Sequence, residues 1–319
     1  MKAFPSFVDI AQALSSYYKI SNPIPTAIVE KEFFTIDILR KLENLMISDD
    51  FILVFSGGTC LTKVYLKNSS RMSEDIDLKM IPNKEYLEKS KSQQKKQRKE
   101  FGERIIDHIL NDQTYDLVSQ KKRNEYRYQE FQIRYPRQGN TLHYLRPEIK
   151  IELTQSVLYQ DAVKKSIESY SAKIMKSDSE VKNFPCSELE SILAEKLLSL
   201  LRRTAGVARG IKEWEDERLI RHAYDLYVTK DLNYSKKVFH DIFWKAAKSD
   251  QERFSQKHTE YRTDIEKELS FGLEQLKATL HFEERYDRFV GPLVFDSKPP
   301  IWEEVLANLE VLFASVLKK

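Results

Sequence analysis

The sequence is poor in cysteine and in long hydrophobic runs. Cys60 and Cys186 are the two cysteines among 319 residues, and their wide separation argues against a disulfide framework and against the paired spacing of a zinc site. The clearest apolar run, residues 51–55, is far shorter than the roughly 20 residues of a membrane-spanning helix, and residues 1–14 lack the apolar segment of a signal peptide. We therefore expect a protein of the reducing cytoplasm that does not cross a membrane.

A marked excess of one charge is also missing. Lys and Arg number 52 against 49 Asp and Glu, which gives a net charge of +3. The whole molecule therefore attracts a polyanion only weakly, and any nucleic-acid surface must be local. Hydrophobic residues make up 41% and charged residues 32%, as in a folded globular protein, and the length is sufficient for two domains.

The character of the sequence changes near Pro185. Before it, short apolar or alternating stretches predict strands at residues 51–55, 75–80, 131–135 and 148–153, with helices at 26–47, 59–66 and 85–110. After it, strand-like alternation largely disappears and helical patterns continue to the carboxy terminus. We expect a bi-lobed α+β protein, with a mixed sheet and its helices in residues 1–185 and an all-helical lobe in residues 186–319.

Asp75 and Asp77 stand out because they alternate with apolar residues. On a strand, side chains two residues apart point to the same face. Two such carboxylates suit Mg²⁺, whose remaining positions are filled by nucleotide phosphates and water, and phosphoryl-transfer enzymes use such ions at the reacting phosphates. The same alternation also describes any half-exposed strand.

A glycine pair precedes this strand. Gly57 and Gly58 lie between a predicted buried strand and a helix start, where main-chain N–H groups can hold phosphates. Alone, the pair also fits an ordinary tight turn. A glycine turn followed within some twenty residues by an acidic strand is the combination found in the nucleotidyltransferase fold of the DNA polymerase β type.

Two stretches carry a closer resemblance. Residues 57–65 read GGTCLTKVY and residues 71–78 read RMSEDIDL. They resemble the paired patterns G-G-T-x-L-x-K-x-[YF] and R-x-S-x-D-[IL]-D-[LF] of the AbiEii/MenT nucleotidyltransferase toxin family. The resemblance implies a polymerase-β-like fold, Asp75 and Asp77 as catalytic Mg²⁺ ligands, and a set of nucleotide-binding residues: Gly57, Gly58, Thr59, Lys63, Arg71 and Ser73. A plain serine at a strand start, or one that is itself modified, is the alternative for Ser73.

Weaker similarities extend from about residue 28 to residue 230. EKEFF at 30–34 resembles an early family helix, with Glu32 in place of Asp, and IKIE at 149–152 resembles a later strand. LAEKLLSLLR at 193–202 and RHAYDLY at 221–227 resemble two segments of the family's second lobe, the latter with His222 in place of Asp.

Lys196 and Asp225 are the charged residues of interest in that lobe. The spacing of Ser187 and Glu190 predicts a capping box and a helix start, and Lys196 then falls within the apolar stripe of the helix. A snorkelling lysine and an i, i+4 pair between Arg221 and Asp225 are the simple explanations. The resemblance instead implies that Lys196 contacts the triphosphate and that Asp225 faces the active site.

A third carboxylate is expected on the strand at 148–153. Glu152 shares a face with Lys150 and Glu148. Glu152, with Glu148 as the alternative, is our candidate for accepting the proton of an acceptor hydroxyl. A solvated strand face explains the same pattern.

The clearest basic region lies between Lys89 and Arg104. Such a run is often only a solvated helix face, but it is also suited to a nucleic-acid backbone. Our candidates for RNA binding are Lys95, Lys96, Arg98 and Lys99.

Together these features predict a toxin of a toxin–antitoxin or phage-defence system. It would transfer a nucleotide from an NTP to the 3′ end of tRNA, and the resemblance implies a cognate antitoxin protein as partner. A protein hydroxyl as acceptor is one alternative. A non-catalytic module that binds RNA or a protein partner is another, although the intact Asp75 and Asp77 argue against it.

Overall fold

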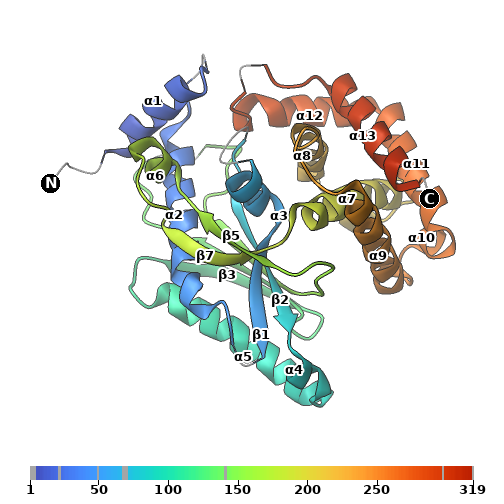
Figure 1. Cartoon of the computed structure of the whole chain (residues 1–319), viewed down its shortest axis with the longest axis horizontal. Helices are drawn as coiled ribbons and strands as arrows, with labels where there is room; N and C mark the ends of the chain where they lie inside the picture. The colour runs from blue at the N-terminus through green and yellow to red at the C-terminus, as the bar shows by residue number, and fades with distance from the viewer. Residues whose placement is uncertain are drawn as a thin grey trace. The chain divides into compact units, whose positions relative to one another are not determined.

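The computed structural model describes residues 5–20, 23–48, 50–66, 71–139, 142–296 and 298–317 (Figure 1). The chain divides into two units. The first comprises Met1–Ser187 with Phe295–Ser297, and the second comprises Glu188–Val294 with Lys298–Lys319. Within the first unit, the ring of Phe295 lies 6.5 Å from the rings of Tyr18 and Tyr170. A short carboxy-terminal segment thus completes the aromatic packing of the first unit.

The first unit contains a seven-stranded mixed sheet in the order β3-β4-β5-β2-β1-β7-β6. The pairs β2/β5 and β1/β7 are parallel and the other pairs are antiparallel. The predicted α+β fold is therefore confirmed. The strands are β1 (Phe51–Ser56), β2 (Asp75–Pro82), β3 (Asp116–Arg123), β4 (Tyr128–Arg134), β5 (Ile149–Gln155), β6 (Val163–Ile167) and β7 (Val181–Cys186).

Strict alternation gives β2 and β5 one apolar face and one polar face. In β2 and β5 every second residue, such as Ile76, Leu78 and Ile151, is fully or almost fully buried. Helix α5 (Lys91–Leu110) covers the apolar face of β1, where the rings of Phe101 and Phe51 lie 5.1 Å apart. The other helices of this unit are α1 (Phe7–Tyr17), α2 (Thr26–Leu42), α3 (Gly57–Cys60), α4 (Lys84–Glu88) and α6 (Tyr170–Met175), with a π-helical turn at Leu61–Tyr65.

The helix predicted at 85–110 is two helices. Ser90 interrupts it by forming a capping box with Gln93: the Gln93 N–H donates to Ser90 Oγ at 3.3 Å, and the Ser90 N–H donates to Gln93 Oε1 at 3.0 Å. Strands β3, β6 and β7 were not predicted, because β3 and β6 are largely polar and β7 contains Pro185, which is unusual inside a strand.

The second unit is helical in its described part. Its helices are α7 (Leu189–Ala208), α8 (Arg221–Val228), α9 (Lys236–Phe254), α10 (Thr259–Thr263), α11 (Ile265–Ala278), α12 (Leu280–Leu293) and α13 (Trp302–Leu317). Helices α9 and α11 pack on α7, and α11 approaches it closely because Gly272 has no Cβ, which would lie 2.2 Å from the Leu201 carbonyl oxygen. In the described residues of either unit, no helix combines the length and apolar character that a membrane span requires.

The predicted capping box at Ser187 is wrong. Helix α7 begins at Leu189, and its N-cap, Glu188, makes no side-chain cap hydrogen bond. Ser187 instead extends the pairing of β7 with β1, since its N–H donates to the Phe55 carbonyl at 2.9 Å. Glu190 accepts a hydrogen bond from the Ser235 N–H at 2.9 Å.

Candidate active site

The glycine turn lies directly against Asp77. Gly57 has φ +72°, and a Cβ at this position would fall 1.9 Å from Asp77 Oδ2. The antiparallel register of β1 and β2 causes this approach, because it pairs Ser56 with Asp77. Only glycine satisfies both the left-handed backbone and the lack of space. The predicted neighbourhood of the turn and the acidic strand is thus present in the structure.

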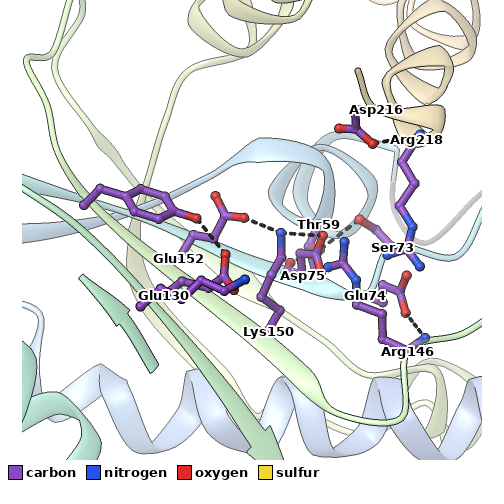
Figure 2. A network of polar contacts seen from close by, with 12 residues as sticks. Thr59, Ser73, Glu74, Asp75, Glu130, Arg146, Lys150, Glu152, Asp216 and Arg218 are labelled. Atoms are coloured by element: carbon purple, nitrogen blue, oxygen red, sulfur yellow. Dashed lines mark hydrogen bonds and ion pairs between the residues drawn. The ribbon is translucent and has the colours of Figure 1, made fainter. Parts of the chain in front are cut away.

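Thr59 links the turn to the start of β2. Its hydroxyl donates to the main-chain carbonyl of Asp75 and lies 2.9 Å from Ser73 Oγ (Figure 2). The Thr59 side chain is fully buried, whereas Ser73 and Asp75 are half-buried. We infer that the Thr59 hydroxyl positions Asp75.

Two cations contact the Asp75 carboxylate. Arg146 contacts Oδ1, and Lys150 Nζ lies 3.3 Å from Oδ2 while it also contacts Glu152 (Figure 2). Burial opposes the charge of both bases. The nearby carboxylates outweigh burial, so the pKa of Arg146 and the pKa of Lys150 are both raised. The carboxylates of the site therefore stabilise the positive charges beside them.

Glu152 stands on the same face as the two aspartates. The parallel register pairs Asp77 with Glu152 and Asp75 with Lys150, and Glu152 is in turn paired with Glu130 on β4. Glu130 accepts hydrogen bonds from the Tyr128 hydroxyl at 2.9 Å and from Lys121 at 3.0 Å. One row of the sheet thus carries three carboxylates, on β4, β5 and β2: Glu130, Glu152 and Asp77. Glu148, the alternative to Glu152, lies before β5 begins.

A buried ion pair supports this face from below. Lys31 Nζ lies 2.8 Å from Glu74 Oε2, with side-chain exposures of 1% and 2%. The Arg146 N–H donates to the same Glu74 oxygen at 3.0 Å, and Lys31 donates to the Arg146 carbonyl at 2.8 Å. Burial lowers the pKa of Lys31, and Glu74 opposes that effect. Sequence reasoning missed this pair, although both residues fall within segments that resemble the family.

Lys63 and Arg71, both expected to bind nucleotide, are buried. Lys63 contacts Glu32, and its ammonium lies 4.0 Å from the centre of the Tyr170 ring. Burial lowers the pKa of Lys63, and Glu32 opposes the shift. Arg71 is also buried and donates to the Met72 carbonyl at 2.8 Å. For Lys63 the structure corrects the expectation: its ammonium neutralises Glu32 inside the core.

Lys196 and Asp225 form an ion pair with each other in the second unit. Lys196 Nζ lies 2.8 Å from Asp225 Oδ2, and their side chains are 7% and 0% exposed. The guanidinium of Arg221 lies over the Phe289 ring, 5.7 Å from its centre. A buried ion pair is a weak source of stability because both charges must be dehydrated. This contact was not predicted, because Lys196 and Asp225 are 29 positions apart in sequence.

The basic helix is α5, and it presents three of its four candidates to solvent. Lys95, Lys96 and Lys99 are exposed. Arg98 is 1% exposed, and its guanidinium donates to the Glu125 carbonyl at 2.8 Å and to the Tyr86 hydroxyl. Arg98 is therefore withdrawn as an RNA-binding candidate, because it connects α5 to the turn before β4.

The carboxylate pair has the donor chemistry for Mg²⁺. Across the described ranges, no group of three or more His, Cys, Asp or Glu residues gathers as a metal site. Magnesium does not need one, because it commonly binds one or two carboxylates together with substrate phosphates. The oxygens of Asp75 and Asp77 beside the glycine turn fit this requirement.

Comparison with known proteins shows the family and the fold of the chain. A sequence model of the family described as nucleotidyl transferase AbiEii toxin, type IV toxin–antitoxin system, matches residues 39–308. The chain belongs to the AbiEii nucleotidyltransferase toxin family. Its fold is similar to that of MenT4, a nucleotidyltransferase toxin from Mycobacterium tuberculosis H37Rv, with a TM-score of 0.60 at 15% identity over 97% of this chain and 90% of that chain. None of the curated proteins matches this sequence.

The burial of Lys63 leads to a stability prediction for this AbiEii-family protein. Lys63→Ala leaves the Glu32 carboxylate buried and unpaired, so we expect it to reduce the free energy of unfolding by about 3–5 kcal/mol. The matched control is Lys99→Ala, which removes an exposed lysine 3.8 Å from Glu103 and should change little. Chemical denaturation measures both. A Lys63→Ala protein as stable as wild type would contradict the structural role.

Proposed function

We propose that this AbiEii-family toxin is a Mg²⁺-dependent enzyme that transfers a nucleotide from an NTP to the 3′ end of an RNA, with tRNA as acceptor. The observation that carries the proposal is the pair Asp75 and Asp77 beside the Gly57 turn, with Glu152 opposite Asp77. Phosphoryl transfer needs positioning and charge neutralisation more than covalent chemistry from the protein, and this arrangement offers both.

Each part of the site then has a role. Mg²⁺ held by Asp75 and Asp77 would supply the charge that neutralises the triphosphate and the leaving pyrophosphate. The main chain at Gly57 and Gly58, with Ser73 beside Asp75, is suited to contact phosphates. Glu152 accepts the proton of the attacking hydroxyl. Lys150 contacts Glu152 and would hold its carboxylate in position.

Lys196 and Asp225 are proposed as the second unit's contribution. A buried lysine and aspartate contribute little net stability, which favours a functional reason for their presence. In this proposal Lys196 adds positive charge at the triphosphate and Asp225 holds its ammonium in place.

RNA binding is assigned to the exposed lysines of α5, namely Lys95, Lys96 and Lys99. A type IV toxin–antitoxin family also implies an antitoxin that restrains the enzyme in the cell, and phage defence is the setting that we propose for the pair.

The carboxylates provide the first test. Asp75→Ala or Asp77→Ala should abolish transfer because each removes a metal ligand, while the fold survives because both positions are half-buried and water can hydrate the groups left behind. The matched control is Asp116→Ala, which removes an exposed carboxylate 3.8 Å from Arg134 on the outer strands. Transfer is measured with each labelled NTP and deproteinised tRNA, followed by sequencing of the 3′ ends. Activity in both variants would refute the site, and label found on lysate protein instead would identify a protein acceptor.

The ion pair of the second unit provides another test. Lys196→Met alone removes the ammonium that pairs with the buried Asp225 carboxylate, so we expect a loss of about 3–5 kcal/mol in stability. The double variant Lys196→Met/Asp225→Leu should recover that stability, because apolar residues of similar volume replace the whole pair. If the pair is catalytic, the stable double variant still loses transfer by orders of magnitude. A stable double variant with wild-type turnover would assign the pair to packing alone.

The RNA surface is tested through salt dependence. Changing Lys95, Lys96 and Lys99 to Ser should weaken tRNA binding, and for each RNA phosphate that is no longer neutralised the slope of log affinity against log salt should fall by about 0.7–0.9. NTP binding should stay unchanged. The control changes Lys237, Lys245 and Lys248, exposed residues of α9, to Ser and removes the same charge. Equal slopes in the two triple variants would show that α5 is a solvated helix without a specific role in RNA binding.

A further inference from the structure

Arg146 has no role in the proposed reaction, yet it contacts the first catalytic aspartate. It lies in the segment before β5, and its guanidinium pairs with Asp75 Oδ1 although 29% of its side chain remains exposed (Figure 2). The segment leads directly into the strand that carries Lys150 and Glu152. Arg146 therefore lies directly beside the proposed metal site, with part of its side chain open to solvent.

The main chain of Arg146 is fixed independently of its side chain. Its N–H and its carbonyl bond to Glu74 and Lys31, and these two residues form a buried ion pair with each other. The guanidinium, in contrast, ends in a pair that solvent reaches. Water can therefore hydrate the guanidinium and the half-buried Asp75 carboxylate when they separate. The side chain of Arg146 can leave Asp75 while its main chain stays in place.

A metal ion on Asp75 would compete with its present partners, because the metal and the two side-chain cations repel one another at this distance. Arg146 contacts Oδ1, and Lys150 lies 3.3 Å from Oδ2. Lys150 keeps Glu152 as a partner when Asp75 is taken from it, whereas the described residues give the guanidinium of Arg146 no second carboxylate within ion-pair distance. Its planar group with five N–H donors is suited to phosphate oxygens.

We propose that Arg146 is a ligand of the triphosphate. In the free protein its guanidinium pairs with Asp75, and it leaves Asp75 when a metal-bound nucleotide binds there. The inference deepens the proposed function and rests on it. Before substrate arrives, Arg146 neutralises Asp75 and competes with free metal ions. When the metal-bound nucleotide reaches Asp75, the released guanidinium binds the phosphates.

Opposite effects on two ligands test this role. Arg146→Ala should tighten Mn²⁺ binding to the free protein by up to about fivefold, because a competing cation is removed. The same change should weaken binding of inorganic tripolyphosphate in the presence of Mg²⁺ by about tenfold or more, because a charged hydrogen-bonding partner is removed. Calorimetric titration measures both affinities. Tripolyphosphate has no nucleobase, so the result does not depend on which NTP the enzyme uses.

Matched variants separate this role from simpler effects. Arg134→Ala removes the same charge from an exposed pair with Asp116 and should change neither affinity. If Arg146→Ala folds poorly, Arg146→Gln replaces it, because it also removes the charge and keeps much of the side-chain length. Unchanged Mn²⁺ affinity or unchanged tripolyphosphate affinity in a folded Arg146 variant would overturn the inference.

The failure of the proposed function would look different. Asp75→Ala should no longer bind Mn²⁺ at this site. Wild-type Mn²⁺ binding by Asp75→Ala would overturn the metal site, and the role of Arg146 with it. Loss of Mn²⁺ binding in Asp75→Ala together with unchanged binding in Arg146→Ala would overturn only the role of Arg146.

Discussion

The close approach of the Asp77 carboxylate to the Gly57 turn is the contact on which the site depends. It requires a residue without Cβ at a positive φ, a strand register that pairs Ser56 with Asp77, and a second strand in parallel register that brings Glu152 beside them. A shift of one residue in either pairing would turn the carboxylates to the apolar face. The buried apolar residues of β2 and β5 prevent that shift, so the core determines the position of the polar row.

Buried ion pairs fix the remaining geometry. Lys31 with Glu74 holds the segment of Arg146, Lys63 with Glu32 lies beneath the Tyr170 ring, and Lys196 with Asp225 occupies the second unit. Each pair would be costly to break on one side. In each of these places a lysine and an acidic residue pair inside the core. Their directional contacts fix the orientation of neighbouring groups, which apolar packing alone would not do.

Local pattern was sufficient for the elements with strong periodicity. The alternation at 75–80 and 148–153 predicted β2 and β5, and the family resemblance together with the change near Pro185 predicted the α+β architecture. Pattern failed where an element depends on its neighbours: β3 is mostly polar and lies at the sheet edge, and β7 tolerates Pro185. Ser187 has the spacing of a cap but serves as the end of a strand.

The candidate site was predictable only in part, for a related reason. Asp75, Asp77 and Glu152 share a face because strand periodicity demands it. Several partners of the charged residues are far away in sequence. Lys196 and Asp225 are 29 positions apart and Asp75 and Arg146 are 71 apart, so no local pattern contains them. Arg98 and Lys63 were misjudged for the same reason, since a basic residue reveals its burial only through the group that neutralises it.

The placement of Phe295 affects the order in which the protein is completed during synthesis. Its ring lies among the aromatic side chains of Tyr18 and Tyr170 in the first unit, yet it follows a long run of residues, Glu188–Val294, that belongs to the second. A ribosome must therefore translate Glu188–Val294 before the first unit acquires this aromatic neighbour. A chain truncated within the second unit lacks this ring, so damaged or unfinished copies leave the ribosome with an incomplete first unit.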